Sequence, residues 1–109
     1  MRLNPFPEPF YYIDLGRCYT LKGEYEKALT EYKKALQHAP KAPWPHMYLA
    51  IAYSLLDRQE EAHASAKKCL ELAPFVSVGW IKKISLFKNE ADLELIIDAM
   101  RKAGFPEGA

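Results

Sequence analysis

The chain repeats itself along its length at an interval of 34 residues. The matching positions are Pro40 with Pro74, Leu15 with Leu49, Tyr19 with Tyr53 and Ala28 with Ala62. A fixed period of about 20 to 50 residues is typical of architectures in which one small unit of secondary structure stacks on copies of itself. The repeat therefore restricts the fold before any local motif is considered.

Each unit is predicted to be a pair of helices. In the first unit, Tyr12, Leu15 and Tyr19 are spaced i, i+3 and i+7, which places them on one face of a helix that Gly23 ends. A second helix carries apolar residues at Tyr25, Ala28, Leu29, Tyr32, Ala35 and Leu36, with charged residues between them. Pro40 cannot continue this helix and so closes the unit.

Small residues are expected where the two helices of a unit meet. Gly16 and Ala28 permit a close approach of the backbones, and Tyr19 and Tyr32 are expected to fill the space beside them. The second unit follows the pattern less strictly. It has Ala66 where an aromatic residue is usual, so looser packing is expected there.

Eight residues of the first unit resemble the signature of the tetratricopeptide-repeat family: Tyr12, Leu15, Gly16, Tyr19, Ala28, Tyr32, Ala35 and Pro40. The resemblance implies an all-α fold, a solenoid of helical hairpins with two full repeats, a partial third repeat and a C-terminal capping helix. We predict a single domain over residues 1–109, with a proline-rich lead-in (1–8), repeat 1 (9–42), repeat 2 (43–76), the partial third repeat with the capping helix (77–104) and a tail (105–109).

Two further segments carry a narrower resemblance. The chain ends in Phe87-Lys88-Asn89-Glu90-Ala91-Asp92-Leu93 and Arg101-Lys102-Ala103-Gly104-Phe105-Pro106-Glu107, and it opens with Pro5-Phe6-Pro7 followed by Tyr11-Tyr12-Ile13-Asp14. Both segments resemble the C-terminal tetratricopeptide regions of bacterial class III adenylate or guanylate cyclases. The resemblance implies an accessory module of a bacterial signalling protein, either cut from a larger chain or standing alone, since cyclase residues would lie in a separate domain.

Charge and composition argue against several kinds of partner. A net charge of +1 lacks the basic excess of a phosphate-contacting surface, so we expect no nucleic acid. No apolar run approaches the roughly 18 residues of a membrane span, so we expect no membrane partner. The first ten residues lack the apolar core that a secretory signal needs, so we expect a cytoplasmic protein. Cys18 and Cys69 are expected to be free thiols that fill small buried positions. We assign no catalytic residue, no cofactor and no metal, because no nucleophile, base and orienting acid and no metal-ligand spacing are recognisable.

In the tetratricopeptide family the first helix of each unit lines a concave groove. By family position, the candidate partner-binding residues are Phe10, Ile13, Asp14, Arg17, Trp44, Met47, Tyr48, Ile51, Ile81 and Lys82. Apolar and aromatic side chains flanked by charge are typical of interaction sites. Alternatively, Trp44 and Tyr48 are covered by the proline-rich N-terminus or by a neighbouring copy of the chain. The Lys and Asn residues with which some members hold a terminal carboxylate are missing, because Ile13, Arg17 and Tyr48 stand at the matching positions.

We therefore predict a protein-interaction scaffold without enzymatic activity. Its partner is a protein or peptide that lays an apolar or aromatic segment in the groove, with Arg17 and Lys82 steering acidic flanks. The alternative is a dimerisation module that regulates an attached nucleotide cyclase. A homodimer is reasonable because a short solenoid exposes repeat ends that can stack on each other.

Overall fold

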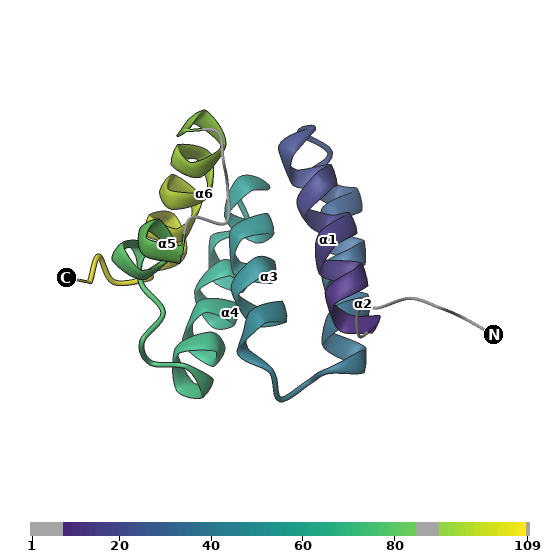
Figure 1. Cartoon of the computed structure of the whole chain (residues 1–109), viewed down its shortest axis with the longest axis horizontal. Coiled ribbons are helices and arrows are strands. Elements are labelled where there is room, and N and C mark those ends of the chain that lie inside the picture. The colour runs from purple at the N-terminus through teal and green to yellow at the C-terminus, as the bar shows by residue number, and fades with distance from the viewer. Residues whose placement is uncertain (1–7, 85–89, 109) are drawn as a thin grey trace.

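The computed structural model describes residues 8–84 and 90–108, and side chains from Tyr11 to Lys83 and from Glu90 onward. Within these residues the chain is helical and contains no strand. The helices are α1 (Glu8–Leu21), α2 (Tyr25–His38), α3 (Pro43–Leu55), α4 (Gln59–Leu72), α5 (Val78–Ile84) and α6 (Glu90–Ala103). Figure 1 shows α1 with α2, and α3 with α4, as two antiparallel hairpins set side by side. The predicted all-α fold of stacked helical hairpins is confirmed.

The turns of the two hairpins repeat each other atom by atom. In the first, the backbone N–H of Glu24 donates to the carbonyl oxygen of Tyr19 at 2.9 Å. In the second, the N–H of Arg58 donates to the carbonyl of Tyr53 at 2.8 Å. Each donor and each acceptor in one turn lies 34 positions from its counterpart in the other. The 34-residue period of the sequence is therefore also the period of the backbone hydrogen bonds in the turns.

The first hairpin closes around Tyr32. Its ring lies so close to Gly16 that a Cβ atom on this glycine would sit 2.2 Å from the ring edge. The Thr20 hydroxyl donates to the Gly16 carbonyl oxygen at 2.9 Å. The Thr20 oxygen lies 3.0 Å from the Tyr32 hydroxyl and can accept a hydrogen bond from it. Tyr32 is 1% exposed, and burial raises its pKa above that of a free phenol. The predicted close approach at Gly16 is confirmed.

The second hairpin has small residues at both equivalent positions. Ala50 replaces Gly16 and Ala66 replaces Tyr32, and both alanines are buried. Ser54, the counterpart of Thr20, is 2% exposed, and its hydroxyl has no hydrogen-bond partner within the described residues. Ser54 lacks the partner that Thr20 has, because Ala66 carries no hydroxyl at the position of Tyr32.

The last helix covers the second hairpin. α6 packs mainly on α3 and less on α4, and its colour gradient in Figure 1 shows that it runs opposite to α3. Its buried face contains Ile96, Ile97, Ala99, Met100 and Ala103, while Asp98, Arg101 and Lys102 are exposed. α3 thus has neighbours on nearly every side, which explains why a helix that is apolar almost all round is stable there.

The two cysteines differ in environment. Cys69 is buried, as predicted, and burial raises the pKa of its thiol to about 12. Cys18, however, is exposed, so the prediction that both thiols are buried is wrong for this residue. Its counterpart Ala52 is buried because α3 lies between neighbours, whereas within the described residues α1 packs mainly on α2 and weakly on α3, and Cys18 remains exposed.

Candidate functional site

The structure separates the predicted groove residues into two groups. The apolar members on α1, α3 and α5 are buried, with exposed fractions of 5% or less: Ile13, Met47, Tyr48, Ile51 and Ile81. Asp14 and Lys82 are exposed, while Arg17 and Trp44 are partly exposed. The side chain of Phe10 lies outside the described residues. Only the second group offers surface to a partner in this arrangement of helices.

Two contacts account for the burial of the apolar members. Tyr48 stacks on Tyr32, with ring centroids 5.2 Å apart, so it joins the two hairpins instead of facing solvent. α6 then lies along α3 and covers a further side of that helix. Burial raises the pKa of Tyr48, as expected for a phenol held away from water. In this arrangement of helices these residues are therefore not accessible to a partner.

Three aromatic side chains form a surface that we call the aromatic cluster: Trp44, Phe75 and Trp80. The indoles of Trp44 and Trp80 are nearly parallel, with an interplanar angle of 3° and centroids 5.5 Å apart. Phe75 meets both edge-on, at 6.3 Å from Trp44 and 5.4 Å from Trp80. Phe75 is 56% exposed, more than any other large apolar side chain in the described residues.

The three rings come from three different elements. Trp44 lies in the first turn of α3, directly after Pro43, which is favourable at a helix start because its missing N–H would have no partner. Phe75 follows Pro74 in the loop after α4, and Trp80 lies on α5. Of these three residues, the sequence predicted only Trp44 as a binding residue, and it missed Phe75 and Trp80. The available signal was the large apolar residue that follows the repeat-closing proline.

Residues near the C-terminus hold α5 and its tryptophan in place. The N–H of Val78 donates to the carbonyl of Pro106 at 2.9 Å, and that of Gly79 donates to Glu107 at 2.8 Å. These N–H groups belong to the first turn of α5, where no intrahelical acceptor exists. Ser77 adds a side-chain cap, since its hydroxyl accepts the N–H of Trp80 at 3.1 Å. The predicted tail is therefore part of the support for the aromatic cluster.

The same segment is fixed by its own side chains. Phe105 is 4% exposed, and the guanidinium of Arg101 donates to both carboxylate oxygens of Glu107, at 2.8 and 3.1 Å. The Arg101 partnership lowers the pKa of Glu107. Gly108 has a φ of +74° and packs against Ser77 so closely that a Cβ atom would lie 2.3 Å from its hydroxyl oxygen. A glycine is therefore required there.

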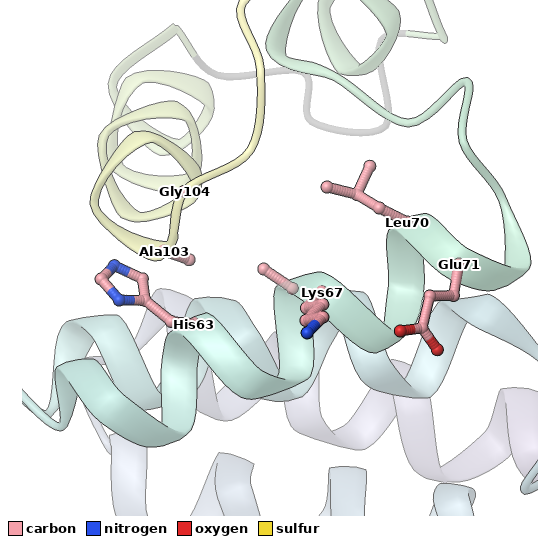
Figure 2. A pocket seen from close by; sticks show the side chains of 7 residues that line it. His63, Lys67, Leu70, Glu71, Ala103 and Gly104 are labelled. Carbon is pink, nitrogen blue, oxygen red and sulfur yellow. The ribbon is translucent and has the colours of Figure 1, made fainter.

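A second surface, which we call the end hollow, lies between α4 and the C-terminal end of α6. Its volume is about 540 Å³ and its lining residues are His63, Ala66, Lys67, Leu70, Glu71, Ala103 and Gly104. Figure 2 shows Leu70 pointing from α4 into the hollow and His63 reaching toward the end of α6. The Nε2 atom of His63 lies 3.0 Å from the carbonyl oxygen of Lys102.

The end hollow has a counterpart one repeat earlier. Lys33, Leu36 and Gln37 of α2 are equivalent to Lys67, Leu70 and Glu71 of α4, and they line a hollow of about 500 Å³. There the opposite wall is made by residues of both α3 and α4. At the end hollow the opposite wall, among the described residues, is the end of α6. The same face of the second helix thus faces a following hairpin in one repeat and the end of a single helix in the next.

Comparison with known families agrees with this geometry. Residues 16–57 match a family model described as TPR repeat, and residues 47–75 match one described as tetratricopeptide repeat. Residues 16–75 are tetratricopeptide repeats. The matched part takes in the C-terminal part of α1, all of α2, α3 and α4, and Phe75 at the edge of the aromatic cluster. Such repeats generally mediate contacts between proteins.

A curated relative shows how these tetratricopeptide repeats occur in a larger protein. Over 74 residues, 67% of this chain, the sequence is 35% identical to a UDP-N-acetylglucosamine--peptide N-acetylglucosaminyltransferase of Giardia intestinalis (strain ATCC 50803 / WB clone C6). The matched stretch is 5% of that enzyme's length. The similarity therefore concerns the repeats, and the transferase activity named for the relative belongs to that whole enzyme.

Two further structural findings concern metals and membranes. Among residues 8–84 and 90–108, no group of three or more His, Cys, Asp or Glu side chains is placed to hold a metal ion. None of the helices described for this tetratricopeptide domain is both long and apolar enough to cross a membrane.

Proposed function

We propose that this tetratricopeptide domain is a non-catalytic scaffold that binds a protein or peptide through an apolar or aromatic segment seated on the aromatic cluster. The observation that carries the proposal is the surface formed by Trp44, Phe75 and Trp80, in which large apolar rings remain partly exposed. Tryptophan and other aromatic residues supply much of the binding energy at protein interfaces because they bury a large area with few rotatable bonds. Among the groove residues predicted from the sequence, Trp44 is the aromatic one whose described side chain is partly exposed.

Charged members of the predicted groove supply the polar flank in this proposal. Arg17 forms an ion pair with Asp14 at 3.4 Å, and Lys82 is exposed on α5, two residues after Trp80. Exposed charges contribute little affinity but accelerate association with a partner of opposite charge. A partner with an apolar centre and acidic flanks fits this arrangement best.

The test is a pair of substitutions in the cluster. Trp44→Ala and Phe75→Ala are expected to weaken binding of the partner, once it is identified by crosslinking in the native host, by at least about tenfold, as for interface hot spots. Titration calorimetry measures the affinity, and far-UV circular dichroism checks that helicity is kept. Phe75→Ala is the sharper of the two because more than half of this side chain is already exposed.

Tyr11→Ala provides the matched control. Tyr11 is an exposed aromatic residue, 47% accessible, but it lies on α1 and contacts Tyr12 rather than the cluster. Its removal should leave the affinity unchanged. Unchanged affinity in both cluster variants, with normal helicity, would refute the proposed binding surface.

The second candidate function is dimerisation. In this function the domain forms a homodimer that regulates an attached nucleotide cyclase. The end hollow supports the dimer part, because Leu70 faces a space that the equivalent Leu36 shares with a following hairpin. The cyclase part rests on the resemblance of the opening and closing segments of the sequence alone. Leu70→Glu should convert the dimer to monomer in sedimentation velocity, with Leu21→Glu, an exposed residue on α1, as control. A chain that is monomeric at every concentration excludes this function.

A further inference from the structure

The aromatic cluster offers hydrogen-bond donors as well as apolar rings. Within the described residues the indole N–H groups of Trp44 and Trp80 have no hydrogen-bond acceptor, and neither indole nitrogen is buried. Both donors therefore face solvent beside the exposed ring of Phe75. We propose that the segment bound by this cluster is a proline-rich stretch of another protein in the polyproline II conformation, with acidic residues at its ends. The inference rests on the proposed function and narrows it to one class of partner.

The accessible donors favour an extended partner. In the polyproline II conformation the backbone carbonyl groups make no internal hydrogen bonds, so they can accept a hydrogen bond from an indole N–H. A partner helix uses its carbonyl groups internally except in its last turn. A partner strand would need the edge of a sheet, and the described residues contain no strand. A polyproline II segment therefore offers acceptors along its whole length, whereas a helix does not.

The arrangement of the rings suits proline for a second reason. The indoles of Trp44 and Trp80 are nearly parallel, and Phe75 meets both edge-on, so the three rings form one continuous apolar surface. Proline-rich segments bind surfaces lined by aromatic side chains, and they lose little entropy because their conformation is already favoured before binding. The cluster thus combines the two features that such a segment needs, which are aromatic rings and accessible donors.

The repeat itself does not require an aromatic surface at this place. Lys41 lies one period before Phe75, and His46 lies one period before Trp80. Lys41 is exposed, while His46 is buried and its Nε2 atom lies 3.3 Å from the carbonyl oxygen of Pro40. The equivalent place in the first repeat is thus polar. Closing a hairpin therefore does not account for the aromatic residues in the second.

Exposed lysines border the cluster and favour acidic ends on the partner. Lys83 lies one turn after the tryptophan of α5, on the same side of that helix, and Lys41 precedes the tryptophan of α3. Both are exposed, and neither forms an ion pair within the described residues. Glu71 and Glu107, from the adjoining segments, are already paired with a lysine at 4.0 Å and an arginine at 2.8 Å. The charge left around the rings is therefore positive.

Synthetic peptides of defined composition test the inference. The probe is a fluorescein-labelled peptide of eight prolines with an aspartate at each end, and its anisotropy reports binding without relying on the tryptophans. Two comparison peptides have the same length. One keeps the aspartates but replaces the prolines with alternating glycine and serine, and it should bind at least about tenfold more weakly because it is not preorganised. The other keeps the prolines but carries lysine ends, and it should bind about threefold more weakly.

Trp80→Phe separates the hydrogen-bond donor from the ring. It keeps an aromatic side chain in the cluster but removes an indole N–H, so it should weaken binding of the proline peptide about fivefold, as for the loss of one hydrogen bond. Tyr11→Phe is the matched control, because it removes a polar hydrogen from an exposed ring outside the cluster, and it should change nothing. Lys83→Glu alters only an exposed charge, so it should keep the fold and reverse the preference for acidic ends.

Equal affinity for the proline and glycine–serine peptides would overturn the inference, as would tighter binding of a helical peptide of alanine, leucine and glutamate. Self-association in sedimentation that Phe75→Ala abolishes and the proline peptide does not displace would also overturn it, because the occupant would then be a second copy of the chain.

The same peptides distinguish this inference from the proposed function. If the proline peptide does not bind while Trp44→Ala and Phe75→Ala still weaken binding of the native partner, the inference fails and the proposed function stands. If the proline peptide binds but those variants leave the affinity for the native partner unchanged, the proposed function fails and the inference fails with it.

Discussion

Repeats 1 and 2 share one backbone, yet the centre of the hairpin is filled in opposite ways. In repeat 1, Tyr32 fits against Gly16, hydrogen-bonds to Thr20 and stacks on Tyr48 of the next hairpin. In repeat 2, Ala66 stands in its place, Ser54 lacks a partner within the described residues, and a hollow opens beside the alanine. A large residue at this position contacts the next hairpin directly, whereas the small residue lines a hollow next to the end of α6.

The comparison predicts its largest effect at Gly16. Gly16→Ala should lower the free energy of unfolding by about 3 kcal/mol, because the added methyl would overlap the buried Tyr32 ring and overpacking of this kind is costly. The matched change in repeat 2 is Ala50→Gly, for which we expect about 1 kcal/mol from helix propensity alone. Urea denaturation measures both. Similar losses in the two variants would show that Tyr32 can move aside.

The next largest effect is expected at alkaline pH, where the buried phenol of Tyr32 in repeat 1 should make the free energy of unfolding depend on pH. The pKa of Tyr32 is raised by burial, so the unfolded chain releases this phenol proton at a pH where the folded chain keeps it. The stability is therefore intact below the unfolded pKa of about 10 and is lost as the pH rises above it, at up to about 1.4 kcal/mol per pH unit.

Tyr32→Phe should make this decline shallower, though some of it should remain because the pKa of Tyr48 is raised in the same direction. Urea denaturation between pH 9 and 11 provides the measurement. An unchanged slope in Tyr32→Phe would mean that Tyr32 ionises without unfolding the chain.

The two buried hydroxyl groups should respond with opposite sign. Thr20→Val removes the partner of the Tyr32 hydroxyl and should cost about 1 to 2 kcal/mol. Ser54→Ala removes a buried hydroxyl that has no partner in the described structure and should stabilise the protein by about 1 kcal/mol. Thermal and urea denaturation report both changes. A loss of stability in Ser54→Ala would reveal that this hydroxyl is satisfied after all.

The smallest effect is expected in the turns. Gly23 has a φ of +83°, and its counterpart Asp57 adopts a φ of +64° although it carries a side chain. Asp57→Gly should stabilise the protein by about 0.5 kcal/mol, because glycine adopts this left-handed conformation without strain. Gly23→Ala should destabilise it by a similar amount. Calorimetric melting can resolve the pair, and equal signs would argue against backbone strain at Asp57.

The sequence predicts the hairpins well because their determinants are local or repeated. The spacing of Tyr12, Leu15 and Tyr19 specifies one face of a helix, and the contact of Gly16 with Tyr32 follows from residue size at a fixed register. Where the period decays, the prediction weakens. The burial of the predicted groove residues on α3 did not follow from the period, because α3 packs on α2, on α4 and on α6, and α6 lies outside the repeated part of the sequence.

The aromatic cluster lay beyond sequence reasoning for a related reason. Phe75 and Trp80 meet Trp44 only because α5 turns in a particular direction after Pro74. That direction is stabilised by hydrogen bonds from the N–H groups of Val78 and Gly79 to the carbonyl oxygens of residues 106 and 107. Because these are backbone atoms, no pattern of side chains in the sequence indicates the pairing. Such pairing between distant backbone atoms leaves no periodic signal.

The attachment of α5 to residues 106 and 107 has a consequence for how the protein is cut or trimmed. A helix of seven residues does not persist in water without outside support, and here its first turn borrows two carbonyl acceptors from the end of the chain. A protease that cut after Gly104 would separate those acceptors and the Phe105 anchor from α5. Such a cut would reshape the tryptophan surface without touching any of its residues, so residues 105–107 influence what that surface can recognise.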